Sequence, residues 1–274
     1  MTSSRASSSE VSGDRPSRAT PVVTCTDLAR GLNSLGVGGM DVILVHSSLS
    51  SFGRFEGGAE GVIAGLLEAV APEGTVMVPT LTGSRELGPG YPPYFDVRAS
   101  SCWTGAVPEA FRRRPEALRS LHPTHSVAAI GPRAREMLAG HELSATPCGN
   151  ETPYGRLVRA DGWVVLLGVG LECVTLLHHV EEVAELPYHM QPEPVPATVV
   201  DYDGSSRTVW VGIHRYGPAR DFSKLEPELR RRGIMLSTEV GAAQVHASRA
   251  KPMVEYALAL VREDPQALLR ERNS

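Results

Sequence analysis

A hydroxyl, an imidazole and a carboxylate recur at a three-residue spacing in the segment TLLHHVEE. Thr175, His178 and Glu181 lie about one helical turn apart, so on a helix they follow one broad face. A histidine held by a carboxylate keeps one tautomer and gains basicity, which suits a general base acting on an amine or a hydroxyl. The segment predicts an acid–base site, although the same spacing is also common in solvated pairs on helix surfaces.

A metal centre is the alternative chemistry for this segment. His178, His179 and Glu181 are all ligand types, and His122 and His125 lie in a second histidine-containing segment. Adjacent histidines on a helix point about 100° apart, however, and the chain has no H-E-x-x-H pattern. We therefore predict that no metal is bound.

The region around this segment is acidic. No Lys or Arg occurs between residues 160 and 206, whereas the acidic side chains there include Glu182 and Glu185. Carboxylates beside a candidate base would attract a cation, and Glu182, Glu185 and the more distant Asp96 are candidates for holding it. The alternative is that these acids are scattered over a solvated surface.

A second polar cluster follows the apolar run DVILVH. The sequence continues as VHSSLSSFG, which places His46, Ser47, Ser48 and Ser50 at the end of an expected buried strand. Hydroxyls and free backbone N–H groups at such a point suit phosphates or an amide-bearing cofactor. The chain has no Walker motif, no G-x-G-x-x-G after a strand and no G-x-S-x-G, so nucleotide hydrolysis, dinucleotide redox chemistry and serine hydrolysis lack support.

The elements that would position these clusters alternate between helix and strand from Thr26 onward, which predicts an α/β fold. A hairpin about Asp203-Gly204 opens a β-rich C-terminal portion, and the segment 81–103 has no clear period and is expected to be a functional loop. The expected helices span 26–35, 61–70, 105–113, 132–139, 152–159, 174–185 and 253–261, and the expected strands span 41–46, 74–79, 126–130 and 163–168.

Composition limits the remaining options. Residues 1–22 are rich in Ser and Arg and are expected to form a disordered tail, with residues 23–274 as a single domain. No apolar stretch approaches the about 20 residues of a membrane helix, and no signal peptide precedes the domain, so we expect a cytoplasmic protein without a membrane partner. A net charge of −4 without a basic patch argues against nucleic acid. We expect a monomer or a homodimer.

Five runs of sequence resemble one known family. They are VHSSLSSFG, EGTVMVPTLTG, FDVRASSCWTGAVPEAFRRRPEALRSLHPTHSVAAIGPRA, ETPYGRLVRADGWVVLLGVG and VTLLHHVEEVAELPY. In this order they closely resemble the aminoglycoside 3-N-acetyltransferase family, over about residues 26–262. The resemblance implies an α/β/α sandwich with a mixed, largely parallel central sheet, and acetyl transfer from acetyl-CoA to an amine of a 2-deoxystreptamine antibiotic.

The family motifs assign roles to individual residues. T-x-x-H-x-x-E makes Thr175, His178 and Glu181 catalytic. H-S-S places His46, Ser47 and Ser48 near the thioester and pantetheine of the cofactor, with Ser50 beside them. R-S-x-H-P-x-x-S places Ser120, His122 and Ser126 beside the cofactor channel, and Asp96 lies in a segment that resembles the loop covering the aminoglycoside.

The resemblance implies direct transfer in a ternary complex, with His178 as the base, Glu181 orienting it, and Thr175 donating to the oxyanion together with a backbone N–H near Ser47 or Ser48. Two alternatives stay open. The chain could acetylate another small cationic amine, or it could be a non-catalytic relative that only binds a cation.

Overall fold

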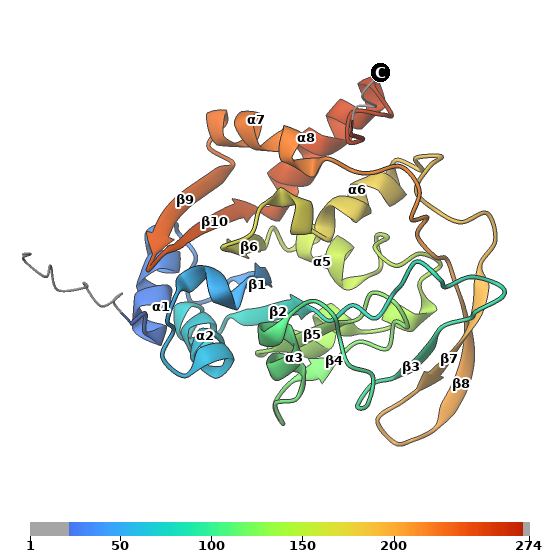
Figure 1. Ribbon diagram of the computed structural model, residues 1–274, viewed down its shortest axis with the longest axis horizontal. Helices are drawn as coiled ribbons and strands as arrows, with labels where there is room; N and C mark the ends of the chain where they lie inside the picture. Colours follow the sequence, from blue (N-terminus) through green and yellow to red (C-terminus); the bar gives the residue numbers. More distant parts are fainter. Residues whose placement is uncertain (1–21, 271–274) are drawn as a thin grey trace, which may run out of the picture.

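A seven-stranded mixed sheet forms the centre of the computed structural model, which describes residues 22–270 (Figure 1). Its strand order is β4-β5-β2-β1-β6-β10-β9. The three central strands β2, β1 and β6 run parallel, and the flanking strands pair antiparallel on both sides. The bounds are β1 Val42–Ser47, β2 Thr75–Pro79, β4 Leu118–Arg119, β5 Val127–Ile130, β6 Trp163–Leu167, β9 Met235–Val240 and β10 Ala243–Arg249.

Helices cover both faces of this sheet. In β1, Ile43 and Val45 pack into one apolar cluster with the first three helices, whereas Val42 and Leu44 pack into another with the last five. This alternation is the two-residue period of a strand buried on both sides. The helices are α1 Cys25–Ser34, α2 Gly58–Ala69, α3 Ala106–Arg112, α4 Ala134–Leu138, α5 Pro153–Arg159, α6 Leu176–Val183, α7 Glu226–Arg231 and α8 Ala250–Glu263. The predicted α/β/α sandwich is confirmed.

A separate three-stranded sheet lies at one side of the molecule, at the lower right of Figure 1. It has the order β3-β7-β8, with β3 Tyr94–Asp96, β7 Val195–Val200 and β8 Ser206–Val211. The predicted hairpin is β7 and β8. The expected loop 81–103 contributes β3, because the fully buried Phe95 anchors it in the core of this sheet beside β7.

Local signals set several boundaries. Thr152 caps α5 as expected, since its side chain accepts a hydrogen bond from Gly155 N–H. Helix α1 begins one residue earlier than predicted because Thr24 and Asp27 form a capping box. Short 3₁₀ segments occupy η1 Leu49–Phe52, η2 His141–Leu143, η3 Leu171–Cys173 and η4 Phe222–Leu225.

Two expectations concern the ends and the surroundings of the chain. The predicted tail 1–22 lies almost wholly outside the described residues, and the single-domain assignment stays a prediction. Within residues 22–270, none of the helices has the length and apolar character needed to cross a bilayer.

Candidate active site

A cavity of about 300 Å³ opens at the carboxyl ends of the three parallel strands. Ser47 at the end of β1 and Pro79 at the end of β2 form part of its wall, and the segment after β6 and the first turn of α6 form another part. Trp103 and Thr104, which precede α3, close one side. Open α/β sheets place ligands at this edge, because the connections leaving parallel strands diverge there.

The segment predicted to do acid–base chemistry forms one wall of this cavity. Thr175 lies just before α6 and His178 in its first turns, and both line the cavity. The His178 side chain is 26% exposed, and its Nδ1 lies 2.6 Å from Oε2 of the fully buried Glu181. Because Nδ1–H donates to Glu181, Nε2 is the nitrogen of His178 that can take a proton.

Glu181 is itself held by two groups distant in sequence. Arg220 Nε donates to Oε1 at 3.0 Å, and His189 Nδ1 lies 2.9 Å from Oε2. Burial alone would raise the pKa of Glu181, but the hydrogen bonds from His178 and His189 outweigh it and hold that pKa well below the ordinary value. Glu181 therefore remains an anion behind the candidate base.

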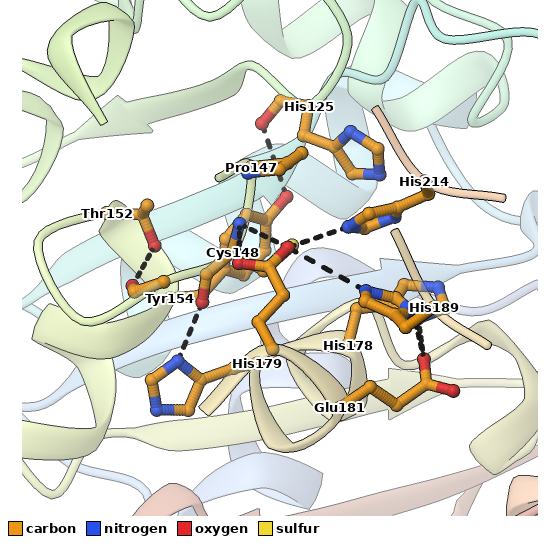
Figure 2. A network of polar contacts seen from close by, with 12 residues as sticks. His125, Pro147, Cys148, Thr152, Tyr154, His178, His179, Glu181, His189 and His214 are labelled. Carbon is orange, nitrogen blue, oxygen red and sulfur yellow. Dashed lines mark hydrogen bonds and ion pairs between the residues drawn. The ribbon is translucent and has the colours of Figure 1, made fainter. Parts of the chain in front are cut away.

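A second histidine–glutamate pair lies beside the first (Figure 2). His214 Nε2 donates to Oε1 of Glu182 at 2.7 Å, and the His214 ring centroid lies 4.9 Å from that of His178 and 4.1 Å from that of His189. Burial, and then the neighbouring histidines, lowers the pKa of His214 well below its usual range. Glu181 and Glu182 raise the pKa of His189 in spite of its burial.

Sequence reasoning missed His189, His214 and Arg220. His189 lies just beyond the expected end of the helix 174–185, and the other two follow the hairpin in segments without any motif. Arg220 brings a cation to the site from beyond the acidic stretch 160–206 and pairs with Glu181. No local pattern marks these three residues.

The geometry has close counterparts among known proteins. Residues 44–262 match the family described as Aminoglycoside 3-N-acetyltransferase. The chain belongs to this family. It is 34% identical over 272 residues to the aminoglycoside N(3)-acetyltransferase VII of Streptomyces paromomycinus, covering 88% of this chain and 92% of that protein. The prediction of an enzyme, an acyltransferase of the aminoglycoside 3-N-acetyltransferase family, is confirmed.

Solved structures show the same fold. The structure of AAC-IIIb in a binary complex with CoASH has a TM-score of 0.76 and 27% identity, covering 89% of this chain and 97% of that one. A variant of aminoglycoside acetyltransferase AAC(3)-IVa in complex with a gentamicin has a TM-score of 0.78 and 29% identity. The match covers 93% of this chain and 94% of that one. The fold of this acetyltransferase chain is therefore that of its family.

Two of the three residues of the H-S-S motif line the cavity of this acetyltransferase, and the third does not. His46 and Ser47 line the cavity, and burial lowers the pKa of His46 to about 3, so its imidazole is neutral. Ser48 lies outside the wall, where its hydroxyl meets that of Ser50 at 3.2 Å. The Ser48 N–H itself donates to Leu167 O at 2.9 Å, and an oxyanion donor among the backbone N–H groups near Ser47 or Ser48 stays a prediction.

Ser120, His122 and Ser126 are buried inside the domain and do not line the cavity. Ser120 Oγ bonds His141 Nδ1 at 2.8 Å, and Ser126 Oγ accepts from Arg119 Nε at 3.0 Å. His122 Nδ1 accepts from a neighbouring backbone N–H in its own turn. Their placement beside the cofactor channel stays a prediction, and the hydroxyls of Ser120 and Ser126 are already hydrogen-bonded within the domain.

The three acidic residues predicted to bind the substrate of this acetyltransferase differ in how exposed their carboxylates are. The burial of Glu182 argues against the prediction that it binds the substrate. Its side chain is 2% exposed, and both carboxylate oxygens accept from the Cys148 N–H at 2.9 Å. Asp96 uses Oδ1 to cap the turn after β3, where it is half-buried. Glu185 is exposed and lines a second cavity, of about 540 Å³, beyond the end of α6. Glu172, which was not predicted as a ligand, places a carboxylate in the wall of the first cavity.

Proposed function

We propose that this chain transfers the acetyl group of acetyl-CoA to the 3-amino group of a 2-deoxystreptamine aminoglycoside, and thereby confers resistance to it. The observation that carries the proposal is the 2.6 Å contact between His178 and buried Glu181 in the wall of the strand-end cavity. The names of the relatives support it, since one is an aminoglycoside N(3)-acetyltransferase and another binds CoASH.

Acetyl transfer needs a base at the attacking amine. With the thioester in the cavity, the aminoglycoside nitrogen attacks the carbonyl carbon while His178 Nε2 accepts a proton from it. The tetrahedral intermediate collapses by breaking the C–S bond, and the imidazolium returns its proton to the departing thiolate. Glu181 stabilises the imidazolium between these two steps, because it stays ionised.

The negative charge that develops on the thioester oxygen needs a donor. Thr175 lies one helical turn from His178 on the same wall, so its hydroxyl can donate to that oxygen. Removing one such donor costs about 3 kcal/mol of transition-state stabilisation in other enzymes. His46 also lines the cavity. Because burial keeps its imidazole neutral, it adds no positive charge to the wall of the cavity.

An aminoglycoside carries several ammonium groups, and acidic side chains at the entrance would hold them. Glu172 lines the cavity that contains His178, Asp96 at the end of β3 is half-buried, and Glu185 beyond α6 is exposed. Unlike Glu182, these carboxylates retain access to solvent. They are the proposed contacts for the cationic substrate.

The decisive assay measures thiol release from acetyl-CoA with and without a panel of aminoglycosides, followed by determination of the acetylated position by NMR. We expect release that depends on an aminoglycoside carrying a free 3-amino group, and none from the His178→Ala variant. Release with simple polyamines but not with the panel would favour another small amine as substrate. Absence of release with every amine would favour a non-catalytic binding protein.

A further inference from the structure

A cysteine lies in the wall of the strand-end cavity that contains His178. Cys173 is the last residue of η3, which follows β6 at the carboxyl end of the strand, and its side chain lines this cavity. It is the exposed cysteine of the chain. The others, which lie outside the cavity wall, are the partly buried Cys25 and Cys102 and the buried Cys148. Acetyl transfer by His178 gives the Cys173 thiol no role.

Two other side chains in this wall indicate that the cavity receives a polar ligand. Thr175 is 5% exposed and His46 is 8% exposed, yet no hydrogen bond joins the Thr175 hydroxyl or Nε2 of His46 to any other described residue. Buried polar groups are nearly always hydrogen-bonded, so unused ones in a cavity wall are expected to meet a ligand. Other parts of the wall are apolar, among them Leu81 and Pro108. The pantetheine arm of CoA, with its amides and methylene groups, matches this mixture.

Acetyl transfer leaves a second thiol in the same cavity. The C–S bond of the thioester breaks beside His178, so the sulfur of CoA lies in the space that Cys173 lines. A thiolate exchanges with a disulfide by attacking one of its sulfurs, and holding both partners in one site raises the rate. We propose that Cys173 is a modification site for disulfides of CoA, and that CoA attached there blocks acetyl transfer until the bond is reduced. This inference rests on the proposed function, which supplies the position of the CoA sulfur.

The step is a thiol–disulfide exchange in which the CoA disulfide is itself the oxidant. With a mixed disulfide of CoA and glutathione, the Cys173 sulfur attacks the sulfur of CoA and forms a new S–S bond. The bond between the CoA and glutathione sulfurs breaks, and its electron pair leaves with the glutathione thiolate. That thiolate takes up the proton that the Cys173 thiol loses. The attached CoA fills the place of acetyl-CoA, so acetyl transfer stops.

Selectivity comes from the cavity, because the thiol itself is not activated. Burial, and then the Glu172 carboxylate, raises the pKa of the Cys173 thiol above its ordinary value, and Cys173 Sγ lies 4.0 Å from Glu172 Oε1. A thiol with a raised pKa forms less thiolate at neutral pH and reacts slowly with disulfides in solution. Cys173 should therefore discriminate strongly between disulfides that bind in the cavity and those that do not.

Mass spectrometry of the reduced wild-type protein tests the site without any assay of activity. The mixed disulfide of CoA and glutathione is compared with glutathione disulfide, because the leaving group is glutathione in both. We expect one CoA per chain, on Cys173, at a rate at least about 10-fold higher than that of modification by glutathione disulfide. Acetyl-CoA has no free thiol and should slow this labelling, while any labelling of the controls Cys25 and Cys102 stays unchanged. Absence of CoA on Cys173, glutathione there in place of CoA, or labelling that acetyl-CoA does not slow would overturn the proposal.

Activity measurements connect the modification to acetyl transfer. After the reagent is removed by gel filtration, the wild type and the Cys25→Ser control should lose product formation in proportion to the CoA bound to Cys173, and dithiothreitol should restore it. Cys173→Ser should keep the activity that it had before treatment, and an equal loss in this variant would overturn the inhibition. Reduced wild-type enzyme that acetylates an aminoglycoside but is not labelled would refute this inference alone. Labelling that acetyl-CoA slows, in an enzyme that acetylates no amine, would refute the proposed function alone.

Discussion

Replacing Glu181 by glutamine tests the reasoning most directly, because the two side chains have the same shape and differ in charge. The wild-type carboxylate is fully buried and touches His178, His189 and Arg220. An amide leaves the His178 imidazolium without its anion and can impose the wrong tautomer. General-base catalysis contributes about 10²–10⁴-fold, and an amide behind a catalytic histidine has cost up to about 10⁴ in kcat elsewhere. We expect kcat to fall by at least about 10²-fold.

The same substitution carries a predictable stability cost. The Arg220 side chain is 15% exposed and would lose its carboxylate partner, although it keeps hydrogen bonds to the carbonyls of Arg215 and Pro218. Breaking one partner of a buried pair costs about 3–5 kcal/mol, and the retained bonds place this case near the lower end. Urea unfolding at neutral pH measures the loss, and circular dichroism establishes that the variant is folded before kinetics are compared.

A matched control separates charge loss at the site from charge loss elsewhere. Asp41 pairs with Arg249 at 3.2 Å beside Trp163, at the opposite end of the parallel strands, so Asp41→Asn should change stability without changing kcat. The KM for acetyl-CoA should stay near its wild-type value in Glu181→Gln, because Glu181 does not line the strand-end cavity. A folded Glu181→Gln variant with wild-type kcat would refute the assignment of His178 as the base.

Three further predictions concern pH, the cofactor and the amine. Burial lowers the pKa of His141 to about 3, whereas the unfolded chain binds that proton near 6.5, so stability should fall with decreasing pH below about 6.5 by about 1.4 kcal/mol per pH unit for each such histidine. His141→Gln should make this slope shallower in urea unfolding from pH 7 to 5, and an unchanged slope would contradict the assignment. Ser47→Leu should raise the KM for acetyl-CoA while Ser48→Leu does not, because only Ser47 lines the cavity; equal effects would place the cofactor elsewhere. Glu172→Gln should raise the aminoglycoside KM more than Glu185→Gln does, and rising salt should weaken wild-type binding by screening over about 8 Å; a salt-insensitive KM would favour a singly charged amine.

Local sequence determined the elements of this protein and one wall of its site. Continuous apolar runs at DVILVH and WVVLLG are typical of central strands buried on both faces, and both lie in the parallel part of the sheet. A polar residue followed by proline at Thr152-Pro153 fixes a helix start. The spacing of Thr175, His178 and Glu181 also suffices to align them, because neighbours three residues apart on a helix face the same side whatever the rest of the chain does.

Tertiary packing decided which other polar residues belong to the site. His214 and Arg220 reach Glu182 and Glu181 only because the chain returns to α6 after the small sheet, whereas His189 reaches Glu181 from the segment that directly follows α6. No short-range pattern encodes the return. The contact with His189 helps to hold the pKa of Glu181 below its ordinary value, so that an anion lies behind His178.

The same dependence on packing applies to the polar residues predicted at the cofactor site. Ser48 and Ser126 have the right types for a cofactor site, but the backbone N–H of Ser48 is used by β6 and the hydroxyl of Ser126 by the buried Arg119. A polar side chain becomes a ligand only where folding leaves its hydrogen-bonding capacity unused. That capacity depends on partners brought in from other strands, which the residue type and its neighbours in sequence do not specify.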